Sequence, residues 1–131
     1  NPDRTVVAFT GDGDFLMTGQ ELATAVHYGA NIIVIIGNNG MYGTIRMHQE
    51  EEYPGRITGT DLTNPDFAAY AQAFGAHGAV VEKTDEFAPA FEAALKSGRP
   101  AVLELRIDAE AILPQVTLSG LREAALEKGQ G

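Results

Sequence analysis

The sequence predicts an α/β fold, in which an open, Rossmann-like parallel sheet is flanked by helices. Residues 5–9 and 31–37 are short apolar runs with the continuous hydrophobicity of strands that are buried on both faces. Residues 18–29 between them have the length of a crossover helix, and helical and strand-like segments alternate downstream. The 131 residues, 44% of them hydrophobic, suffice for one domain with its own core.

The first βαβ unit carries helix signals between its two strands. Thr18 is a candidate N-cap, Glu21 is its capping-box partner three residues later, and Gly29 is a C-terminal stop. A right-handed crossover places the carboxyl ends of both strands at one edge of the sheet, where open α/β sheets bind ligands. Side chains that follow the two strands are therefore expected to meet at this edge.

Polar residues follow each of these strands. Gly11-Asp12-Gly13 comes after the first strand, and Asn38-Asn39 comes after the second, with 24 residues between the two motifs. Because neighbouring strands lie about 4.8 Å apart, the carboxylate of Asp12 and the amide oxygen of Asn39 can both bind one Mg²⁺ or Ca²⁺ at about 2.1–2.5 Å. The two glycines allow backbone N–H groups to approach phosphate oxygens. The sequence thus predicts a site for a divalent cation together with a diphosphate.

A long connection follows the motif, over residues 40–63. Its length indicates that it has a function or some structure of its own. Residues 42–48 are expected to form a short helix, which Tyr53-Pro54-Gly55 brings to an end. The run Glu50-Glu51-Glu52 is interpreted as a solvated face.

The remaining segments continue the α/β alternation. Asn64 and Pro65 predict the start of a helix, and Gly75 predicts its end. The buried stripe of this helix has the spacing i, i+3, i+4, i+7 and consists of Phe67, Tyr70, Ala71 and Phe74. A strand at 79–81, a helix at about 85–97, a strand at 101–107 and a tail helix at 118–128 are expected to follow. The helix at 85–97 is expected to bury Phe87, Phe91, Ala94 and Leu95.

The two polar motifs, at this spacing, resemble the cofactor motif of thiamine-diphosphate (TPP) enzymes. Residues 11–54 are similar to the C-terminal diphosphate-binding module of the acetolactate synthase and pyruvate decarboxylase group, and the resemblance extends more weakly over nearly the whole chain. It implies a TPP-binding fold for residues 1–131, with TPP and Mg²⁺ as cofactors. It also implies that the full-length protein is a TPP-dependent lyase or transferase that acts on small 2-oxo acids.

The resemblance implies roles for individual residues as well. The metal would be bound by the side chains of Asp12 and Asn39 and by the backbone carbonyl of Met41. The diphosphate would lie against a group of residues from both motifs, namely Gly11, Gly13, Asp14, Gly43 and Thr44. The family more often has a small neutral residue at position 14. Since a carboxylate beside a diphosphate is repulsive, only the backbone N–H of Asp14 is assigned to binding.

Parts of such an enzyme would lie outside this chain. The chain opens almost directly on a strand, so an N-terminal part of the module is expected to be missing. The glutamate that activates TPP in the family comes from the pyrimidine-binding domain, usually of a partner subunit. A homo-oligomer is therefore expected, no residue of this chain is assigned a catalytic role, and the isolated chain is expected to be inactive. Of the histidines, only His48 is considered for contact with substrate or cofactor, whereas His27 and His77 are interpreted as structural or surface residues.

Other interpretations of the motif have less support. A lone Gly-Asp-Gly or Asn-Asn sequence is typical of tight turns. A dinucleotide fingerprint would need a third glycine where Leu16 stands and an acidic residue after the second strand, which residues 36–38 do not supply. A non-catalytic nucleotide-binding or subunit-interface module of the same fold remains open as the alternative function.

Composition argues against several kinds of partner. Nine basic against 18 acidic residues give a net charge of −9, which disfavours nucleic acids and anionic membranes as partners. There is no cysteine, so neither a disulfide framework nor thiol chemistry is available. The sequence has no signal-like start and no apolar run of about 18 residues, which predicts a cytoplasmic protein.

Overall fold

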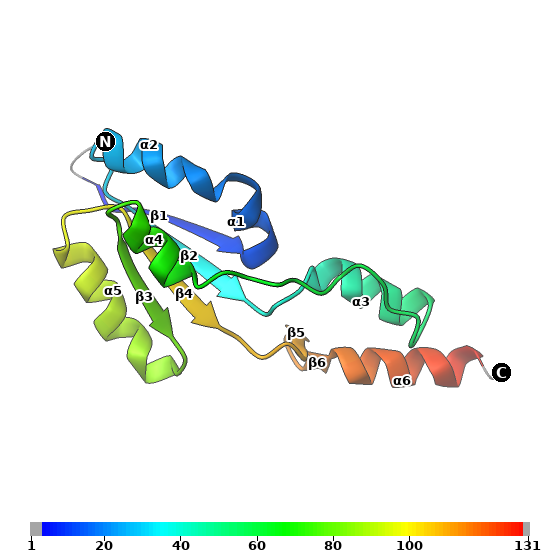
Figure 1. Ribbon diagram of the computed structural model, residues 1–131. Coiled ribbons are helices and arrows are strands. Elements are labelled where there is room, and N and C mark those ends of the chain that lie inside the picture. Colours follow the sequence, from blue (N-terminus) through cyan, green and yellow to red (C-terminus); the bar gives the residue numbers. More distant parts are fainter. Residues whose placement is uncertain (1–3, 130–131) are drawn as a thin grey trace. The chain divides into compact units, whose positions relative to one another are not determined.

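The computed structural model describes residues 4–129, which group into two compact units. The first, called here the sheet unit, contains the residues up to Asn38 together with Asn64–Arg106. The second, called the helix unit, contains Asn39–Thr63 and the residues from Ile107 onward. Figure 1 shows the helices and strands of both units, and each unit is described by itself.

The sheet unit is built on a four-stranded parallel sheet. Its strands are β1 (Val6–Gly11), β2 (Ile32–Asn38), β3 (His77–Val81) and β4 (Ala101–Arg106), in the spatial order β1-β2-β4-β3. Gly11 at the end of β1 lies opposite Gly37 near the end of β2. The predicted parallel sheet is therefore confirmed, including the neighbouring positions of the two motif-bearing strands (Figure 1).

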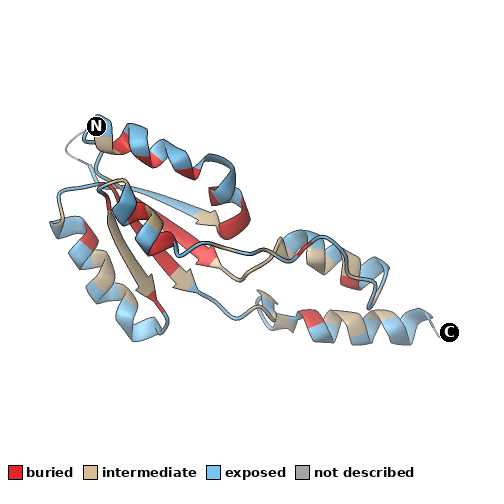
Figure 2. Cartoon of the chain, in the orientation of Figure 1, coloured by how far each residue is buried: buried red, intermediate tan, exposed pale blue. Residues whose placement is uncertain are grey.

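Helices cover both faces of this sheet. One face is covered by α1 (Asp12–Thr18), a 3₁₀ turn (Gly19–Glu21), α2 (Leu22–His27) and α4 (Phe67–Ala73), while α5 (Phe87–Lys96) packs on the other. The two central strands are the most deeply buried elements, as Figure 2 shows in red. Their apolar sequences, which lack polar alternation, agree with burial on both faces.

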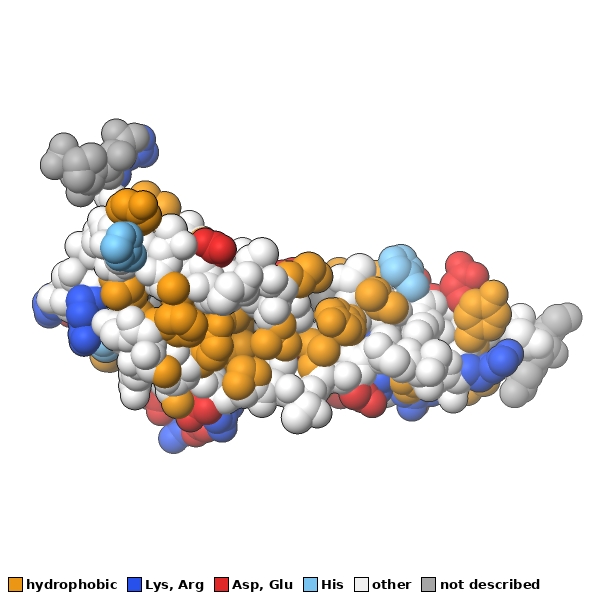
Figure 3. All heavy atoms as spheres, turned by 45° about the horizontal axis from the view of Figure 1, so that its top comes forward, with side chains coloured by type: hydrophobic (Ala, Val, Ile, Leu, Met, Phe, Trp, Pro, Cys, Tyr) orange, Lys and Arg blue, Asp and Glu red, His pale blue; other side chains and the backbone are white. Residues whose placement is uncertain are grey.

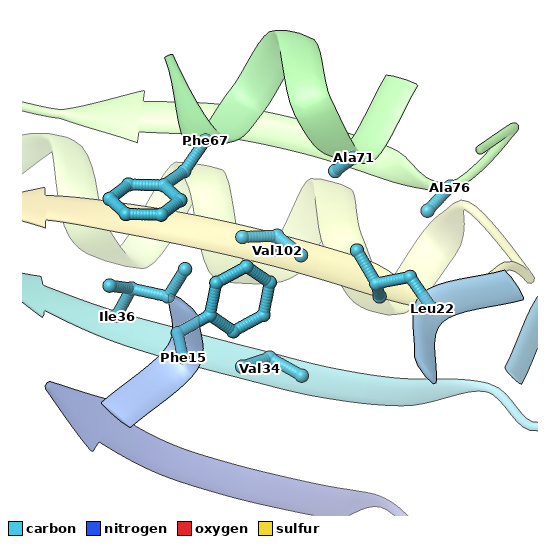
Figure 4. Packing of buried hydrophobic residues seen from close by; sticks show 8 residues of the cluster. All are labelled: Phe15, Leu22, Val34, Ile36, Phe67, Ala71, Ala76 and Val102. Atoms are coloured by element: carbon cyan, nitrogen blue, oxygen red, sulfur yellow. The ribbon is translucent and has the colours of Figure 1, made fainter. Parts of the chain in front are cut away.

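The larger core lies between the sheet and α1, α2 and α4. Its side chains converge from the two central strands, from the three helices and from the connection between α4 and β3, as Figure 4 shows for Phe15, Leu22, Val34, Ile36, Phe67, Ala71, Ala76 and Val102. Phe15 meets Phe67 edge to face, with ring centroids 5.5 Å apart. Helix α4 also approaches β3 very closely, because a Cβ built on Gly78 would lie 2.2 Å from the carbonyl oxygen of Ala68.

The first crossover differs from the prediction at its start. The helix begins at Asp12, directly after β1, and Thr18 ends α1 without forming a side-chain cap. The hydroxyl of Thr24 donates to the carboxylate of Glu21 at 2.7 Å, so Glu21 does not close a capping box with Thr18. The early start is needed to point Phe15 into the core, which a loop over residues 12–17 would leave unfilled. The stop at Gly29 agrees with its left-handed φ of 62°.

The start of α4 also differs from the prediction. Asp66 is the N-cap, and its Oδ1 accepts a hydrogen bond of 2.8 Å from the backbone N–H of Ala69. Asn64 does not cap the helix, because its amide is engaged elsewhere in the sheet unit. The predicted stripe is confirmed, since Phe67 and Ala71 are fully buried and Tyr70 and Phe74 pack against the core.

The other elements of the sheet unit follow the predictions closely. Helix α5 is preceded by a 3₁₀ turn over Thr84–Glu86, and it buries Ala94 while Phe87 and Phe91 pack on the second core. Leu95 was expected inside, but it is exposed because it lies beside the buried stripe of the helix. The described residues contain no helix that is long and apolar enough to cross a membrane.

The helix unit consists of two helices and a small hairpin. Helix α3 (Gly43–Glu52) is longer than the predicted 42–48 and has Tyr53 as its C-cap. Helix α6 (Leu118–Gly129) confirms the predicted tail helix. Strands β5 (Ala111–Leu113) and β6 (Val116–Thr117) form an antiparallel pair that was not predicted. Two- and three-residue strands are too short to produce a readable alternation in the sequence.

The interpretation of residues 50–52 as a solvated face is wrong for Glu50. Its side chain is fully buried, and both its oxygens accept hydrogen bonds from Arg122, one of them at 2.8 Å. The N–H of Gly55 donates to it at 3.1 Å, and Nε of Arg46 lies 3.9 Å away. A carboxylate with these partners can be buried without remaining unpaired. The bonds from Arg122 hold the pKa of Glu50 below its ordinary value of 4.5, in opposition to burial, and the bond from Gly55 adds to this.

Candidate functional site

Asp12 lies at the carboxyl edge of the sheet unit, where β1 passes directly into α1. Only 2% of the residue is exposed. Its Oδ1 accepts a hydrogen bond of 2.9 Å from the backbone N–H of Gly13, and its Oδ2 accepts one of 2.7 Å from the side-chain amide of Asn64. A carboxylate oxygen has two acceptor sites, so neither of these bonds prevents Asp12 from binding a hard cation.

Asn38 ends β2 and takes part in the same hydrogen-bonded group. Its Oδ1 accepts a bond of 2.9 Å from Asn64, and its Nδ2 donates a bond of 2.8 Å to Oε1 of Glu104. Glu104 is 2% exposed on β4, and its Oε2 accepts a bond of 3.3 Å from the N–H of Phe67. Hydrogen bonds thus connect Asp12, Asn64, Asn38 and Glu104, and this set is called here the amide bridge.

Sequence reasoning did not assign Asn64 or Glu104 to the site. A signal for Glu104 was available, because it is the single charged residue among the apolar residues 101–105 of a strand. Buried glutamates are rare unless they have partners. Asn64 carried no such signal, because Asn before Pro is an ordinary helix start.

Gly11, Gly13 and Asp14 lie beside Asp12, where β1 ends and α1 begins. Gly11 ends β1, and Gly13 is buried in the first turn of α1. The exposed carboxylate of Asp14 accepts a long hydrogen bond of 3.4 Å from the N–H of Gly11. This contact holds the carboxylate of Asp14 beside Gly11, at the end of β1.

The remaining predicted residues lie in the helix unit. Oδ1 of Asn39 accepts a hydrogen bond of 3.2 Å from the N–H of Met41, which in turn pairs with Asp61 in an isolated antiparallel bridge. Gly43 begins α3, where a Cβ would lie 2.8 Å from Nδ2 of Asn39 and 2.9 Å from Cδ1 of Ile112. A side chain at position 43 would therefore require the ends of the Asn39 and Ile112 side chains to move.

The start of α3 offers backbone donors to a ligand. No side chain caps this end of the helix, where Gly43 and Thr44 form the first turn. The first N–H groups of a helix have no partner within the helix, and phosphates commonly bind there. The diphosphate-binding role that the resemblance implies for Gly43 and Thr44 stays a prediction.

The eight predicted residues form two local groups. Gly11, Asp12, Gly13 and Asp14 belong to the sheet unit, and Asn39, Met41, Gly43 and Thr44 belong to the helix unit. Among the residues that the structure describes, no three His, Cys, Asp or Glu side chains gather as a metal site. A site made of one carboxylate, one side-chain amide and one backbone carbonyl, as predicted, would not require such a cluster.

The following contacts of the three histidines do not involve the predicted site residues. His48 is exposed on α3, and its Nδ1 lies 3.5 Å from the carboxylate of Glu51. His27 packs edge to face with Tyr28 at the end of α2. His77 begins β3, and its buried Nε2 has no hydrogen-bond partner among the described residues.

Comparison with known proteins places these features in a family. Residues 1–105 match the family model of the thiamine pyrophosphate enzyme, C-terminal TPP binding domain. The chain belongs to this family, as the resemblance of its motifs implied. It is 39% identical over 108 residues to the catabolic acetolactate synthase of Raoultella terrigena, a match that covers 82% of this chain and 19% of that protein.

Two solved structures share the fold. The thiamine diphosphate-dependent 4-hydroxybenzoylformate decarboxylase of Rhodococcus jostii RHA1 aligns with a TM-score of 0.76 and 32% identity, covering 82% of this chain and 20% of that one. The benzoylformate decarboxylase of Polynucleobacter necessarius aligns with a TM-score of 0.78 and 31% identity, covering 86% and 21%. The chain therefore spans about a fifth of the length of the relatives it matches.

The cofactor of this family is TPP, used with Mg²⁺, which confirms the predicted cofactors. The donors on this chain suit such a pair. Asp12 is a buried hard-oxygen ligand at a sheet edge, and α3 begins with uncapped backbone N–H groups. Mg²⁺ prefers oxygen ligands and completes its shell with phosphate oxygens and water.

Proposed function

We propose that this chain is the cofactor-anchoring module of a TPP-dependent enzyme that decarboxylates or joins small 2-oxo acids. The observation that carries the proposal is the buried carboxylate of Asp12, held by two hydrogen bonds at the carboxyl edge of the sheet in a TPP-binding family member. The names of the relatives, an acetolactate synthase and two 2-oxo acid decarboxylases, support this class of substrate.

The proposal assigns metal binding to three residues. Asp12 and Asn39 provide side-chain oxygens to Mg²⁺, and Met41 provides its backbone carbonyl. The bond from the N–H of Met41 to Oδ1 of Asn39 orients that amide and leaves the oxygen one acceptor site for the cation. A charged and a neutral oxygen ligand together suit Mg²⁺ better than Zn²⁺, which prefers nitrogen or sulfur.

Diphosphate binding is assigned to backbone groups. Gly11, Gly13 and the N–H of Asp14 line the cofactor on the side of the first motif, and Gly43 and Thr44 provide N–H groups from the start of α3. The carboxylate of Asp14 accepts a long hydrogen bond from the N–H of Gly11, so only the backbone N–H of Asp14, and not its side chain, is assigned to the diphosphate.

The chemistry is divided between the cofactor and the protein. Bound TPP supplies an electron sink for the carbon atom that loses carbon dioxide. This chain holds the diphosphate and neutralises its charge through the metal ligands. The proton transfers that activate the cofactor are assigned to a glutamate of the pyrimidine-binding domain, which is expected from a partner subunit of a homo-oligomer. Residues 1–131 are accordingly proposed to be one module of a longer enzyme. The cytoplasmic location of that enzyme stays a prediction.

The proposal is tested by an activity panel on the full-length protein. Decarboxylation and carboligation of pyruvate, benzoylformate and glyoxylate are measured with and without TPP and Mg²⁺. We expect turnover of at least one 2-oxo acid that requires both cofactors. Absence of turnover, combined with tight binding of a nucleotide in place of TPP, would instead favour a non-catalytic nucleotide-binding module.

A further inference from the structure

The amide bridge of the sheet unit has a fixed hydrogen-bond direction. Its two ends, Asp12 and Glu104, are acidic side chains, which accept hydrogen bonds when ionised. Asn38 must therefore turn its NH₂ group toward Glu104, which leaves its oxygen to face Asn64. Asn64 must then turn its own NH₂ group toward Asn38, and the same nitrogen reaches Asp12 at 2.7 Å. The two hydrogens of one amide nitrogen serve both acceptors.

Asn64 keeps this orientation although its own oxygen is left unsatisfied. Oδ1 of Asn64 is buried and has no hydrogen-bond partner among the described residues. Buried amide oxygens usually have a donor. Turning the amide over would not help, because Oδ1 of Asn64 would then face the carboxylate of Asp12 and Oδ1 of Asn38. The two bonds from Nδ2 therefore determine the position of the side chain.

Glu104 lies in the interior of the sheet and fixes the orientation of the Asn38 amide, which in turn fixes that of the Asn64 amide. It lies on β4, two strands away from β1, and the N–H of Phe67 and Nδ2 of Asn38 are its donors. Nε of the exposed Arg106 side chain lies 3.5 Å from it. An apolar residue would fill this central strand position without the desolvation of a carboxylate. Packing alone does not explain why the position carries an acid.

We infer that Asn64 and Glu104 are positioning residues for the metal site. Asn64 holds the carboxylate of Asp12 directly, and Glu104 fixes the direction of the bridge through Asn38. The inference rests on the proposed function, because it takes Asp12 as the Mg²⁺ ligand. Residues behind a metal ligand commonly set its orientation, and their loss weakens metal affinity about 10–100-fold.

The replacement Glu104→Gln tests the direction of the bridge without changing the size of the side chain. Gln presents one oxygen and one NH₂ group, whereas its neighbours Asn38 and Phe67 both present donors. If Asn38 turns over to accept from Gln, its own NH₂ group faces that of Asn64. Two NH₂ groups that face each other repel, so Asn64 is displaced and Asp12 loses its well-directed donor, Nδ2 of Asn64. Asn64→Ala removes the same donor directly.

Titration calorimetry on the full-length protein measures the Mg²⁺ concentration at which TPP binding is half-saturated. We expect Asn64→Ala and Glu104→Gln to raise it about 10–100-fold. The matched controls are Asn31→Ala and Glu92→Gln, at exposed positions of the sheet unit. We expect both controls to leave the Mg²⁺ requirement unchanged. Thermal unfolding without Mg²⁺ is measured for every variant to separate metal affinity from stability.

The outcomes distinguish the inference from the proposed function. If both test variants are less stable without Mg²⁺ but keep the parent Mg²⁺ requirement, the bridge is purely structural and the inference is overturned. If Asn64→Ala does not fold, Glu104→Gln decides alone, since it keeps the volume of the side chain. If the parent protein does not bind TPP at all, the proposed function itself fails.

Discussion

Arg122 and Glu50 form the main ionic contact of the helix unit. Arg122 of α6 reaches the fully buried carboxylate of Glu50 on α3 with two of its nitrogens. A buried carboxylate that loses its partner retains its desolvation cost, which makes removal of one member costly. The effect is moderated here, because 38% of the Arg122 side chain is exposed.

We expect Arg122→Ala to lower the free energy of unfolding by about 1–3 kcal/mol at pH 7, the cost of leaving a buried acceptor without its donor. Urea denaturation of the chain measures it. The matched control is Lys96→Ala, which breaks the exposed pair with Glu92 and is expected to change stability by less than about 0.5 kcal/mol. Equal effects of the two substitutions would contradict the role given to Glu50.

The same pair predicts a pH dependence. Bonds from Arg122 lower the pKa of Glu50 in the folded protein from its ordinary value of 4.5. A carboxyl group with a lowered folded pKa stabilises the fold above its unfolded pKa, and this contribution disappears as the pH falls through the folded pKa. We therefore expect the stability difference between the parent and Arg122→Ala to be constant from pH 7 to about 5 and to shrink at lower pH. A difference that grows on acidification would show that another group is responsible.

At the scale of elements, the sequence was most informative where periodicity was long. The apolar runs of β2 and β4 and the stripe of α4 were predicted with their burial, because these patterns report directly on core-facing positions. Helix starts were less readable. Thr18 and Asn64 are good capping residues by type, but the burial of Phe15 and the amide bridge override that local preference.

Packing of α4 on β3 leads to a prediction about Gly78. The space for a Cβ is already occupied by the carbonyl oxygen of Ala68, only 2.2 Å away. Backbone cannot yield as a flexible side chain can, so we expect Gly78→Ala to destabilise the chain by about 1–3 kcal/mol. The matched control is Gly129→Ala on α6, where a Cβ meets nothing within 4 Å. Thermal or urea unfolding compares the two, and a neutral Gly78→Ala would contradict the close approach.

For the molecule as a whole, β1 is the least covered part of the sheet. It pairs only with β2 among the described residues, and Val6, Val7 and Phe9 are exposed. Hydrophobic side chains, shown in orange, gather visibly on the face seen in Figure 3. Apolar surface of this kind, next to an unpaired strand edge, commonly marks an interaction site.

We therefore expect the isolated 131-residue chain to associate in solution, as measured by light scattering. Phe9 is 75% exposed, and Phe9→Ser should reduce the association. The matched control is Tyr28→Ser at the end of α2, which replaces a residue of similar exposure, 78%, that is not part of β1. A monomeric parent chain, or equal effects of both substitutions, would contradict the role of β1.

The arrangement of the whole chain determines which parts of the site could be predicted from the sequence. The two motifs identify the family and its cofactors, because their spacing reflects a βαβ unit. The amide bridge could not be predicted, since it joins residues that are distant in sequence and lie on β2, on β4 and before α4. Such contacts depend on the strand order β1-β2-β4-β3, which no local pattern specifies.

The proposed role of Asp12, to anchor TPP through Mg²⁺, is tested most directly by a calorimetric titration of the full-length protein. TPP is titrated at saturating Mg²⁺ into the parent, Asp12→Ala and the exposed control Asp85→Ala. We expect Asp12→Ala to lose at least about 10-fold in TPP affinity, since Asp12 supplies the charged Mg²⁺ ligand, while Asp85→Ala binds like the parent. Circular dichroism should show the same folded spectrum for all three. Unchanged, Mg²⁺-dependent TPP affinity in a folded Asp12→Ala variant would contradict the claim.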